Sequence, residues 1–310
     1  MRCLVTGGAG FIGSNLVDAL LARGEEVTVV DDLSTGRRDN LEPGLAAGAE
    51  LVEMDIRDGE ALRRLAGEKR PERIFHLAAQ IDVRKSLADP CFDAAINVGG
   101  TANVLEAGRA SECGRVVSIS TGGAIYGEGD GQQLPLPEDA PIAPLSAYGQ
   151  SKFAAEGYVS LYQRLYGLSG VSLRLGNVYG PRQDPLGEAG VIAIFCGLLK
   201  EGGRPKVFGD GTQTRDYIYV GDVVAAALAA GEADATGALN IGTGVETNVL
   251  ELIEALKGLS GNDSFEPEFA PERTGEVQAI SIDATRAQQE LGWQAEMDLQ
   301  DGLRVTLDSI

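Results

Sequence analysis

A chain of 310 residues is long enough for one large α/β unit, or for a nucleotide-binding domain with a smaller second lobe. Its 44% hydrophobic and 23% charged residues are ordinary globular values, and no stretch approaches the roughly 18 apolar residues that a membrane span needs. The 26 basic and 46 acidic residues give a net charge of −20, which argues against nucleic acid or an anionic membrane surface as a partner.

The beginning of the chain lacks the pattern of a signal peptide, and the cysteines lack the pattern of a metal site. Cys3, Cys91, Cys113 and Cys196 form no C-x-x-C pair, and His76 is the only histidine. We therefore expect no bound metal, and reduced, mostly buried thiols in a cytoplasmic protein.

Short apolar or β-branched runs alternate with helical segments through the first half of the chain. The runs are residues 2–7, 25–31, 49–55, 73–78 and 115–120, and the helical segments are 15–24, 59–70 and 92–110. Further strands are expected at 169–180 and 237–242. This repetition predicts a Rossmann-type, doubly wound parallel sheet of about seven strands with helices on both faces.

The pattern loosens after about residue 176. A loop rich in Gly and Pro at 180–190 precedes a helix at 191–202, two short strands around 206–211 and 215–220, and a helix from about Gly221. Residues 250–259 and the segment after Trp293 are again helical in pattern. We expect a larger domain of residues 1–175 and 217–245, interwoven with a smaller α/β domain of residues 176–216 and 246–310.

A glycine-rich segment joins the first strand to the first helix. Gly10 would let the backbone approach a pyrophosphate, Gly13 would let helix and strand pack closely, and the helix N-terminus supplies free N–H groups. Asp31 and Asp32 end the second strand, where a carboxylate accepts hydrogen bonds from an adenosine ribose and repels a 2′-phosphate. The pattern predicts a dinucleotide site that takes NAD rather than NADP.

Two further polar residues follow strands. Asp55 could accept a hydrogen bond from the adenine amino group or could cap the helix after it, and the sequence leaves both roles open. His76, at the end of the fourth strand, is interpreted as a hydrogen-bonded structural residue rather than an acid or base.

Tyr148 and Lys152 are four residues apart, so a helix would place them on one face, one turn apart. A tyrosine, with a reference pKa near 10, is a poor base at neutral pH, but a neighbouring ammonium stabilises its phenolate. Ser120 and Thr121 end the fifth strand, where a hydroxyl could hydrogen-bond the reacting substrate oxygen. Together with the glycine loop, these residues predict oxidation and reduction at a hydroxyl-bearing carbon.

In order and spacing, a set of motifs resembles the extended short-chain dehydrogenase/reductase family over nearly the whole chain. Within that family the chain is most similar to bacterial UDP-glucose 4-epimerases, which implies an NAD-dependent nucleotide-sugar epimerase acting as a homodimer. The first domain would bind NAD and the second the nucleotide sugar. The motifs are TGGAGFIGSNLVDALL, VVDDLSTG, HLAAQ, the asparagine of INVGGT, STGGAIYG, AYGQSKFAAE, LRLGNVYGPRQDP and RDYIYVGDV.

The resemblance assigns Tyr148 as the general base, Lys152 as its activator and a ribose ligand, and Thr121 as the hydroxyl partner, with Ser120 as a contender because STGGAIYG carries one residue more than the usual motif. Asn177, Arg215 and Arg273 would hold the nucleotide diphosphate. The positions that match cofactor contacts are Gly7, Gly10, Phe11, Ile12, Gly13, Asp31, Asp32, Ser34, Gly36, Asp55, Ile56, Leu77, Ala78, Ala79, Asn97 and Ser120.

The family's 4,6-dehydratases carry an Asp-Glu pair directly after the Thr, where this chain has Gly122 and Gly123. Glycine transfers no proton, so epimerisation at C4 of UDP-glucose and UDP-galactose is the favoured reaction, with N-acetylated sugars as a relaxed activity. Arg182 could instead meet a uronate carboxylate, as in a UDP-glucuronate 4-epimerase, or could anchor its loop or a phosphate. Other nucleotide-sugar chemistry and an inactive NAD-binding regulator are the remaining alternatives.

Overall fold

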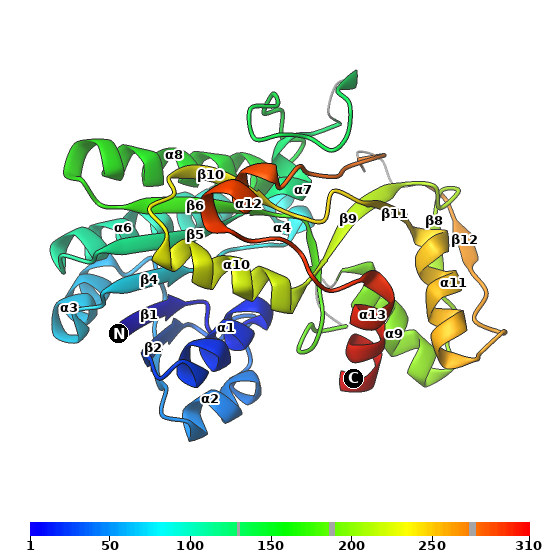
Figure 1. The fold of residues 1–310 in the computed structure, drawn as a ribbon, viewed down its shortest axis with the longest axis horizontal. Coiled ribbons are helices and arrows are strands. Elements are labelled where there is room, and N and C mark those ends of the chain that lie inside the picture. The colour runs from blue at the N-terminus through cyan, green and yellow to red at the C-terminus, as the bar shows by residue number, and fades with distance from the viewer. Residues whose placement is uncertain (129–130, 186–189, 273–276) are drawn as a thin grey trace.

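The computed structural model describes residues 1–128, 131–185, 190–272 and 277–310. At the centre of its larger lobe lies a seven-stranded sheet in the order β10-β6-β5-β4-β1-β2-β3 (Figure 1). Every pairing in this sheet is parallel, which confirms the predicted α/β class. The strands are β1 (Arg2–Thr6), β2 (Glu26–Asp31), β3 (Glu50–Glu53), β4 (Arg73–His76), β5 (Arg115–Thr121), β6 (Gly170–Leu175) and β10 (Gly237–Ile241).

Helices cover both faces of this sheet because its strands are apolar on both sides. In β1, Cys3 and Val5 pack into one core and Leu4 into the other. The first core is closed by α1 (Phe11–Ala22), α10 (Val220–Glu232) and α12 (Thr285–Leu291). The second is closed by α3 (Gly59–Lys69), α6 (Thr101–Ala110) and α8 (Ala147–Tyr166).

Short helices occupy the connections at the carboxyl ends of the strands. The single helix expected over 92–110 consists of α5, a π-helical segment η2 and α6, one after another. A π-helical turn inserted between α-helices often marks a functional site. The short elements are η1 (Arg38–Leu41), α2 (Glu42–Ala46), α4 (Val83–Ala88), α5 (Pro90–Ala94), η2 (Ala95–Gly100) and α7 (Gly122–Ile125).

The smaller lobe combines two small sheets with three helices, seen at the right of Figure 1. One sheet has the order β11-β9-β7, and the other pairs β12 with β8. Phe195, Leu252, Phe265 and Leu303 belong to its separate apolar core. The elements are β7 (Asn177–Tyr179), α9 (Val191–Glu201), β8 (Lys206–Phe208), β9 (Thr214–Tyr219), β11 (Glu246–Asn248), α11 (Val249–Ser260), β12 (Glu268–Ala270) and α13 (Leu299–Ser309).

The strand expected over 169–180 is divided at Gly176, with β6 in the large sheet and β7 in a small one. A Cβ atom at Gly176 would lie 2.8 Å from the carbonyl oxygen of Asp216, so only glycine fits this crossing. The Asp216 carboxylate is buried and accepts hydrogen bonds from the backbone N–H groups of Thr243, Gly244 and Ile282. Asp216 thereby joins the segments that run between the lobes.

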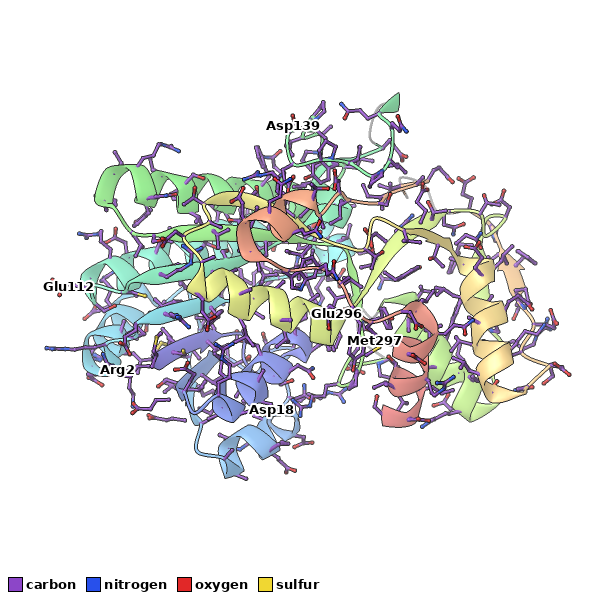
Figure 2. The ribbon with its side chains drawn as sticks, in the orientation of Figure 1. Arg2, Asp18, Glu112, Asp139, Glu296 and Met297 are labelled. Carbon is purple, nitrogen blue, oxygen red and sulfur yellow. The ribbon has the colours of Figure 1, made fainter. Side chains whose placement is uncertain are left out.

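The chain returns to the large sheet at α10, which begins directly after β9. The helix α12 also packs on the large lobe, against β10 and α10, although it belongs to the segment expected in the second domain. The backbone N–H of Met297, labelled in Figure 2, donates to the Asp222 carboxylate on α10 on the way to α13. In the described part of the chain, no helix is long and apolar enough to cross a membrane.

Candidate active site

The glycine loop between β1 and α1, called here the glycine cradle, has no room for side chains at Gly7 and Gly13. Gly7 has a positive φ of 72°, and a Cβ atom at Gly13 would lie 2.1 Å from the carbonyl oxygen of Gly7. Gly10 is the N-cap of α1, where no side chain caps the helix and no acidic residue lies in the first turn. The helix N-terminus is therefore uncapped by side chains, and its N–H groups and dipole suit the diphosphate of a dinucleotide. Phe11 and Ile12 form the first turn of this helix.

The two aspartates at the end of β2 have different surroundings. Asp31 is only 7% exposed and accepts hydrogen bonds from the backbone N–H groups of Ala9 and Leu33, both at 2.9 Å. Burial raises its pKa, and these two hydrogen bonds oppose the rise. Asp32 is exposed and holds the Ser34 hydroxyl at 2.6 Å. Asp31 thus connects the turn after β2, predicted to bind the ribose, to the glycine loop, while the Asp32 carboxylate is exposed at the surface.

In the turn after Asp31, position 36 has room for a glycine but not for a larger residue. A Cβ atom at Gly36 would lie 2.8 Å from the Asp31 carboxylate.

Asp55 and Ile56 follow β3. Asp55 binds the Arg57 side chain, which lowers the pKa of this carboxyl. The residue that caps α3 is Asp58, which accepts from the Ala61 N–H at 3.0 Å. The helix-cap alternative for Asp55 is therefore wrong, and its adenine contact stays a prediction. Ile56 is buried against Gly100 of η2.

His76 has the structural role expected for it. Its ring lies between the hydroxyls of Thr6 and Thr101, at 2.7 and 2.9 Å. Burial, together with the nearby Lys152 charge, lowers its pKa to about 3, so the ring is neutral at physiological pH.

The loop after His76 lies against β1. The N–H groups of Leu77 and Ala78 both donate to the Thr6 carbonyl, ahead of Ala79. The predicted cofactor contacts 77–79 therefore adjoin the glycine cradle.

Asn97 in η2 is buried and connects this loop to α8. Its Nδ2 donates to the Gln80 carbonyl at 2.9 Å and to the Ser151 hydroxyl at 3.0 Å, and its Oδ1 accepts from the Gln80 N–H at 2.8 Å. Because Ser151 directly precedes Lys152, the predicted cofactor residue Asn97 fixes the start of the helix that carries Tyr148 and Lys152.

Tyr148 and Lys152, the pair predicted to be catalytic, lie in the first turns of α8. Ser146 caps this helix by accepting from the Gly149 N–H, and the Tyr148 N–H donates to the Ser86 hydroxyl of α4 at 3.0 Å. The Thr121 side chain, at the end of β5, is close enough to the Tyr148 hydroxyl to favour its ionised form. The structure thus brings together the three residues predicted to be catalytic, since Lys152 is buried one turn after Tyr148.

The electrostatics of the pair are set by burial. Burial raises the pKa of Tyr148 to about 12, against the effect of the nearby Thr121 side chain, and the Asp93 charge adds to the rise. Burial lowers the pKa of Lys152 to about 8, while the carboxylates of Glu156 and Asp93 oppose this change. In the protein alone, therefore, the Tyr148 phenol keeps its proton at neutral pH and needs additional positive charge to act as a base.

Ser120, the alternative to Thr121 as the hydroxyl beside Tyr148, has a different hydrogen-bond partner. Its hydroxyl donates to the Glu156 carboxylate, which also forms a buried ion pair with Arg174 at 2.8 Å. The motif AYGQSKFAAE ends at Glu156, but nothing in it predicts an ion pair with Arg174, which lies 18 residues further along the chain.

Asn177 and Arg215, predicted to bind substrate, lie on the neighbouring strands β7 and β9. A Cβ atom at Gly123 would lie 3.3 Å from the Asn177 side-chain oxygen, so Asn177 is close to the segment that begins at Thr121. Arg215 donates to the Thr214 carbonyl at 2.7 Å. Arg273 lies outside the described residues.

Arg182 has a positive φ of 72° and forms an ion pair with Asp18 of α1, labelled in Figure 2. Asn15 of α1 donates to the Pro181 carbonyl, so the loop is fastened to α1 at two points. The loop-anchoring role is the one this geometry supplies, and a contact with substrate stays a prediction.

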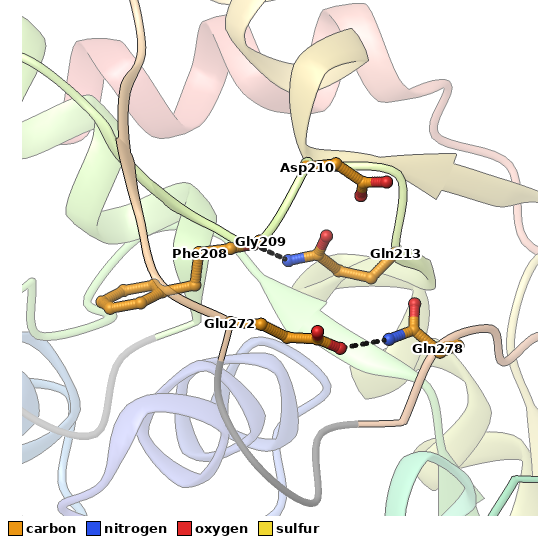
Figure 3. Close-up of a pocket in the computed structure, with 6 residues that line it drawn as sticks. All are labelled: Phe208, Gly209, Asp210, Gln213, Glu272 and Gln278. Atoms are coloured by element: carbon orange, nitrogen blue, oxygen red, sulfur yellow. Dashed lines mark hydrogen bonds between the residues drawn. The ribbon is translucent and has the colours of Figure 1, made fainter.

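A polar pocket of about 210 Å³ lies in the smaller lobe. Gln213 donates to the Phe208 carbonyl at 3.0 Å, and Gln278 donates to the Glu272 carboxylate at 3.1 Å (Figure 3). The sequence did not reveal this pocket, because its two walls lie about sixty residues apart in the chain. Its lining residues are Phe208, Gly209, Asp210, Gln213, Glu272 and Gln278.

Known proteins resemble this chain over its full length. UDP-glucose 4-epimerase of Mycolicibacterium smegmatis is 48% identical over 310 residues, covering 99% of this chain and 98% of that protein. The Thermotoga maritima UDP-glucose 4-epimerase, solved with UDP-glucose, has a TM-score of 0.95 and 44% identity over 100% of this chain and 98% of its own. The Thermus thermophilus UDP-glucose 4-epimerase in complex with NAD has a TM-score of 0.92 and 42% identity, with the same coverage.

The family model that matches this chain spans residues 3–242, from β1 to the end of β10. The match includes the glycine cradle, the Thr121–Tyr148–Lys152 site and the strand that carries Arg215. The chain therefore belongs to the NAD dependent epimerase/dehydratase family.

Proposed function

We propose that this protein is a UDP-glucose 4-epimerase, an isomerase that interconverts UDP-glucose and UDP-galactose with NAD as a retained cofactor. The observation that carries the proposal is the half-buried Tyr148 side chain, which is influenced by Thr121 at the end of β5 and lies one helical turn before the buried Lys152. The relatives named UDP-glucose 4-epimerase support the choice of sugar.

In this mechanism Tyr148 Oη takes the proton of the sugar 4-hydroxyl and later returns it. Thr121 orients the same oxygen by hydrogen bonding, and the Lys152 ammonium stabilises the phenolate. NAD, held by these residues, would supply a hydride acceptor for C4 and a positive charge that favours the phenolate. The 4-keto sugar must turn over in the site between the two transfers, so that hydride returns to the other face of C4.

The residues of the cradle suit this cofactor. The open N-terminus of α1 would hold the diphosphate, Asp31 and Asp32 the adenosine ribose, and Lys152 the second ribose. The carboxylates at the end of β2 would repel a 2′-phosphate, which favours NAD over its phosphorylated form.

The neighbours of Thr121 support epimerisation over dehydration. Loss of water from the sugar needs a second acid and base, but Gly122 and Gly123 follow Thr121. A Cβ atom at Gly122 would lie 2.7 Å from the Ile282 side chain, so a carboxylate there would require Ile282 to move. The site therefore offers proton transfer only at the Tyr148 oxygen.

For the nucleotide end of the substrate, we assign the pocket of Figure 3 to the base and Arg215 to the diphosphate. Amide groups of Gln213 and Gln278 complement the alternating donors and acceptors of uracil, and the Phe208 backbone adds another polar edge. The carboxylates of Asp210 and Glu272 would repel a phosphate in the same place.

A uronate sugar is the second candidate, and it depends on Arg182. The ion pair with Asp18 engages this guanidinium, although its Nη1 is buried without a hydrogen-bond partner among the described residues. A panel of UDP-sugars, including UDP-glucuronate and N-acetylated sugars, tested for inversion at C4 decides the question. We expect UDP-glucose and UDP-galactose to give the highest kcat/KM, and preference for the uronate would overturn the assignment.

We also propose that the protein acts as a homodimer in the cytoplasm. Leu87, Phe92, Phe153 and Leu165 are large apolar side chains exposed on α4, α5 and α8, which pack against one another. Exposed apolar surface of this kind suits a second copy of the chain. Sedimentation should give twice the mass of the chain, and Leu165→Glu should weaken the dimer if α8 is in the interface. The four free cysteines are consistent with a reducing compartment.

A further inference from the structure

Asp93, on α5, is a fully buried acid to which the proposed mechanism gives no role. Its side chain is 0% exposed. Oδ1 accepts hydrogen bonds from Gln80 Nε2 at 2.8 Å and Asn97 Nδ2 at 3.2 Å. In the part of the chain that the structure describes, Oδ2 has no hydrogen-bond partner. Such an arrangement is costly for a carboxylate unless a positive charge compensates for it.

A short chain of hydrogen bonds connects Asp93 to the catalytic helix. Asn97 Nδ2, which contacts Asp93, also donates to the Ser151 hydroxyl, and Ser151 donates to the Tyr148 carbonyl at 3.0 Å. Asp93 therefore acts on α8 between Tyr148 and Lys152, and its charge affects both side chains.

Of the described cations on α4 and α8, which pack against α5, Lys152 is the buried one. On α8, Lys152 is followed one turn later by Glu156, whose carboxylate raises the Lys152 pKa as Asp93 does, although it also forms an ion pair with Arg174. On α4, Arg84 and Lys85 are exposed to solvent, which screens them.

The remaining titratable groups near α5 have partners other than Asp93. Asp82 and Asp89 cap α4 and α5, and Arg57 lies over the Phe92 ring. The His76 ring is neutral, and η2 contributes no titratable side chain.

We propose that Asp93 is a positioning residue whose buried negative charge holds the Lys152 ammonium in place and sets the pH range in which Tyr148 exchanges a proton with substrate. This inference rests on the proposed function of Tyr148 and Lys152. Without the Asp93 charge, the Tyr148 phenolate forms more easily and the Lys152 ammonium is lost more easily. Both limbs of the pH profile should therefore move to lower pH.

The test compares Asp93→Asn, which removes the charge but keeps the shape, with Asp93→Glu, which keeps the charge. For Asp93→Asn we expect the kcat profile to move by about one pH unit toward acid. Asp93→Glu should keep the wild-type profile even if its kcat is lower. An unchanged profile in Asp93→Asn would reduce Asp93 to a structural residue.

A second measurement does not depend on the substrate. The ultraviolet absorbance of the phenolate, titrated in NAD-loaded protein and corrected by subtracting the Tyr148→Phe curve, reports Tyr148 directly. Asp93→Asn should lower its midpoint, and an unshifted midpoint would contradict the inference. If no UDP-sugar is turned over, the proposed function fails, yet this titration still tests Asp93.

Two further variants control for the possibility that Asp93→Asn disturbs folding rather than charge. Asp93→Ser retains an oxygen acceptor without the charge, and it should shift the titration in the same direction as Asp93→Asn. Asp222→Asn removes another buried carboxylate, one that lies on α10 and accepts a hydrogen bond from the Met297 N–H. This variant should leave the titration of Tyr148 unchanged.

Discussion

The two lobes differ in how deeply their polar groups are buried. In the large lobe Asp31, His76 and Asn97 are buried and hydrogen-bonded within the protein, so the cofactor cradle and the catalytic helix are held before any ligand arrives. The pocket of the smaller lobe is instead built from short segments, with Asp210 and Glu272 among its lining residues. We therefore expect the large sheet to preorganise the chemistry and the smaller lobe to recognise the nucleotide.

The strongest test of this division is Tyr148→Phe. The variant keeps the ring but removes the group that exchanges the proton, so kcat should fall about 10²- to 10⁴-fold. NAD content should stay at the wild-type level, because the glycine cradle is unchanged. Tyr162→Phe removes a hydroxyl from the same helix, where it bonds Glu106, and serves as the control. Near-full activity in Tyr148→Phe would remove this residue from its role.

Gly13→Ala tests the cradle itself. The new Cβ would meet the Gly7 carbonyl oxygen at 2.1 Å, so the loop and α1 must separate. We expect a loss of about 1–3 kcal/mol in the free energy of unfolding and purification without NAD. Gly67→Ala in α3, where a Cβ would meet nothing within 4 Å, is the matched control for stability. Full NAD content in Gly13→Ala would mean that the cofactor is held elsewhere.

A substitution in the smaller lobe should change substrate affinity rather than chemistry. Arg215→Gln removes the charge assigned to the diphosphate, and we expect KM to rise about 10- to 100-fold with a smaller change in kcat. Arg204→Gln, an arginine of the same lobe that donates to the Glu266 carbonyl, should leave KM unchanged. A loss confined to kcat would break the division between the lobes.

The smallest effect is expected where the 180–184 loop meets α1. The Arg182–Asp18 pair is partly exposed, so its loss should cost less than about 1 kcal/mol and change UDP-glucose turnover by less than about fivefold. Arg182→Ala and Asp18→Asn break the same pair from opposite sides and should behave alike. A rise in KM, or a selective loss of uronate turnover, in Arg182→Ala alone would instead indicate that Arg182 contacts the sugar.

The sequence predicted the large lobe well because its signals are local. The strand–glycine–helix order around Gly7 to Gly13 and the four-residue step from Tyr148 to Lys152 each lie within one short segment. Parallel strands then bring their carboxyl ends to one edge, which explains why residues from β1, β2, β4 and β5 meet.

The remaining features depend on contacts between distant segments. The run 169–180 has uninterrupted strand character, and only the approach of Asp216 to Gly176 divides it between two sheets. The pocket is lined by residues between 208 and 213 together with Glu272 and Gln278, and Glu156 on α8 forms an ion pair with Arg174 on β6. Asp93 lies four residues before Asn97, so helical spacing could have paired them, but nothing in the sequence predicts its complete burial.

The most direct test of the central claim follows one hydrogen atom. UDP-glucose carrying deuterium at C4 is incubated with the purified protein, without added cofactor or reductant, and the product is analysed by mass spectrometry and NMR. If hydride leaves C4 and returns to it within a closed site, UDP-galactose should form with the deuterium still at C4. Exchange of the label with solvent, or the absence of inversion, would contradict the account.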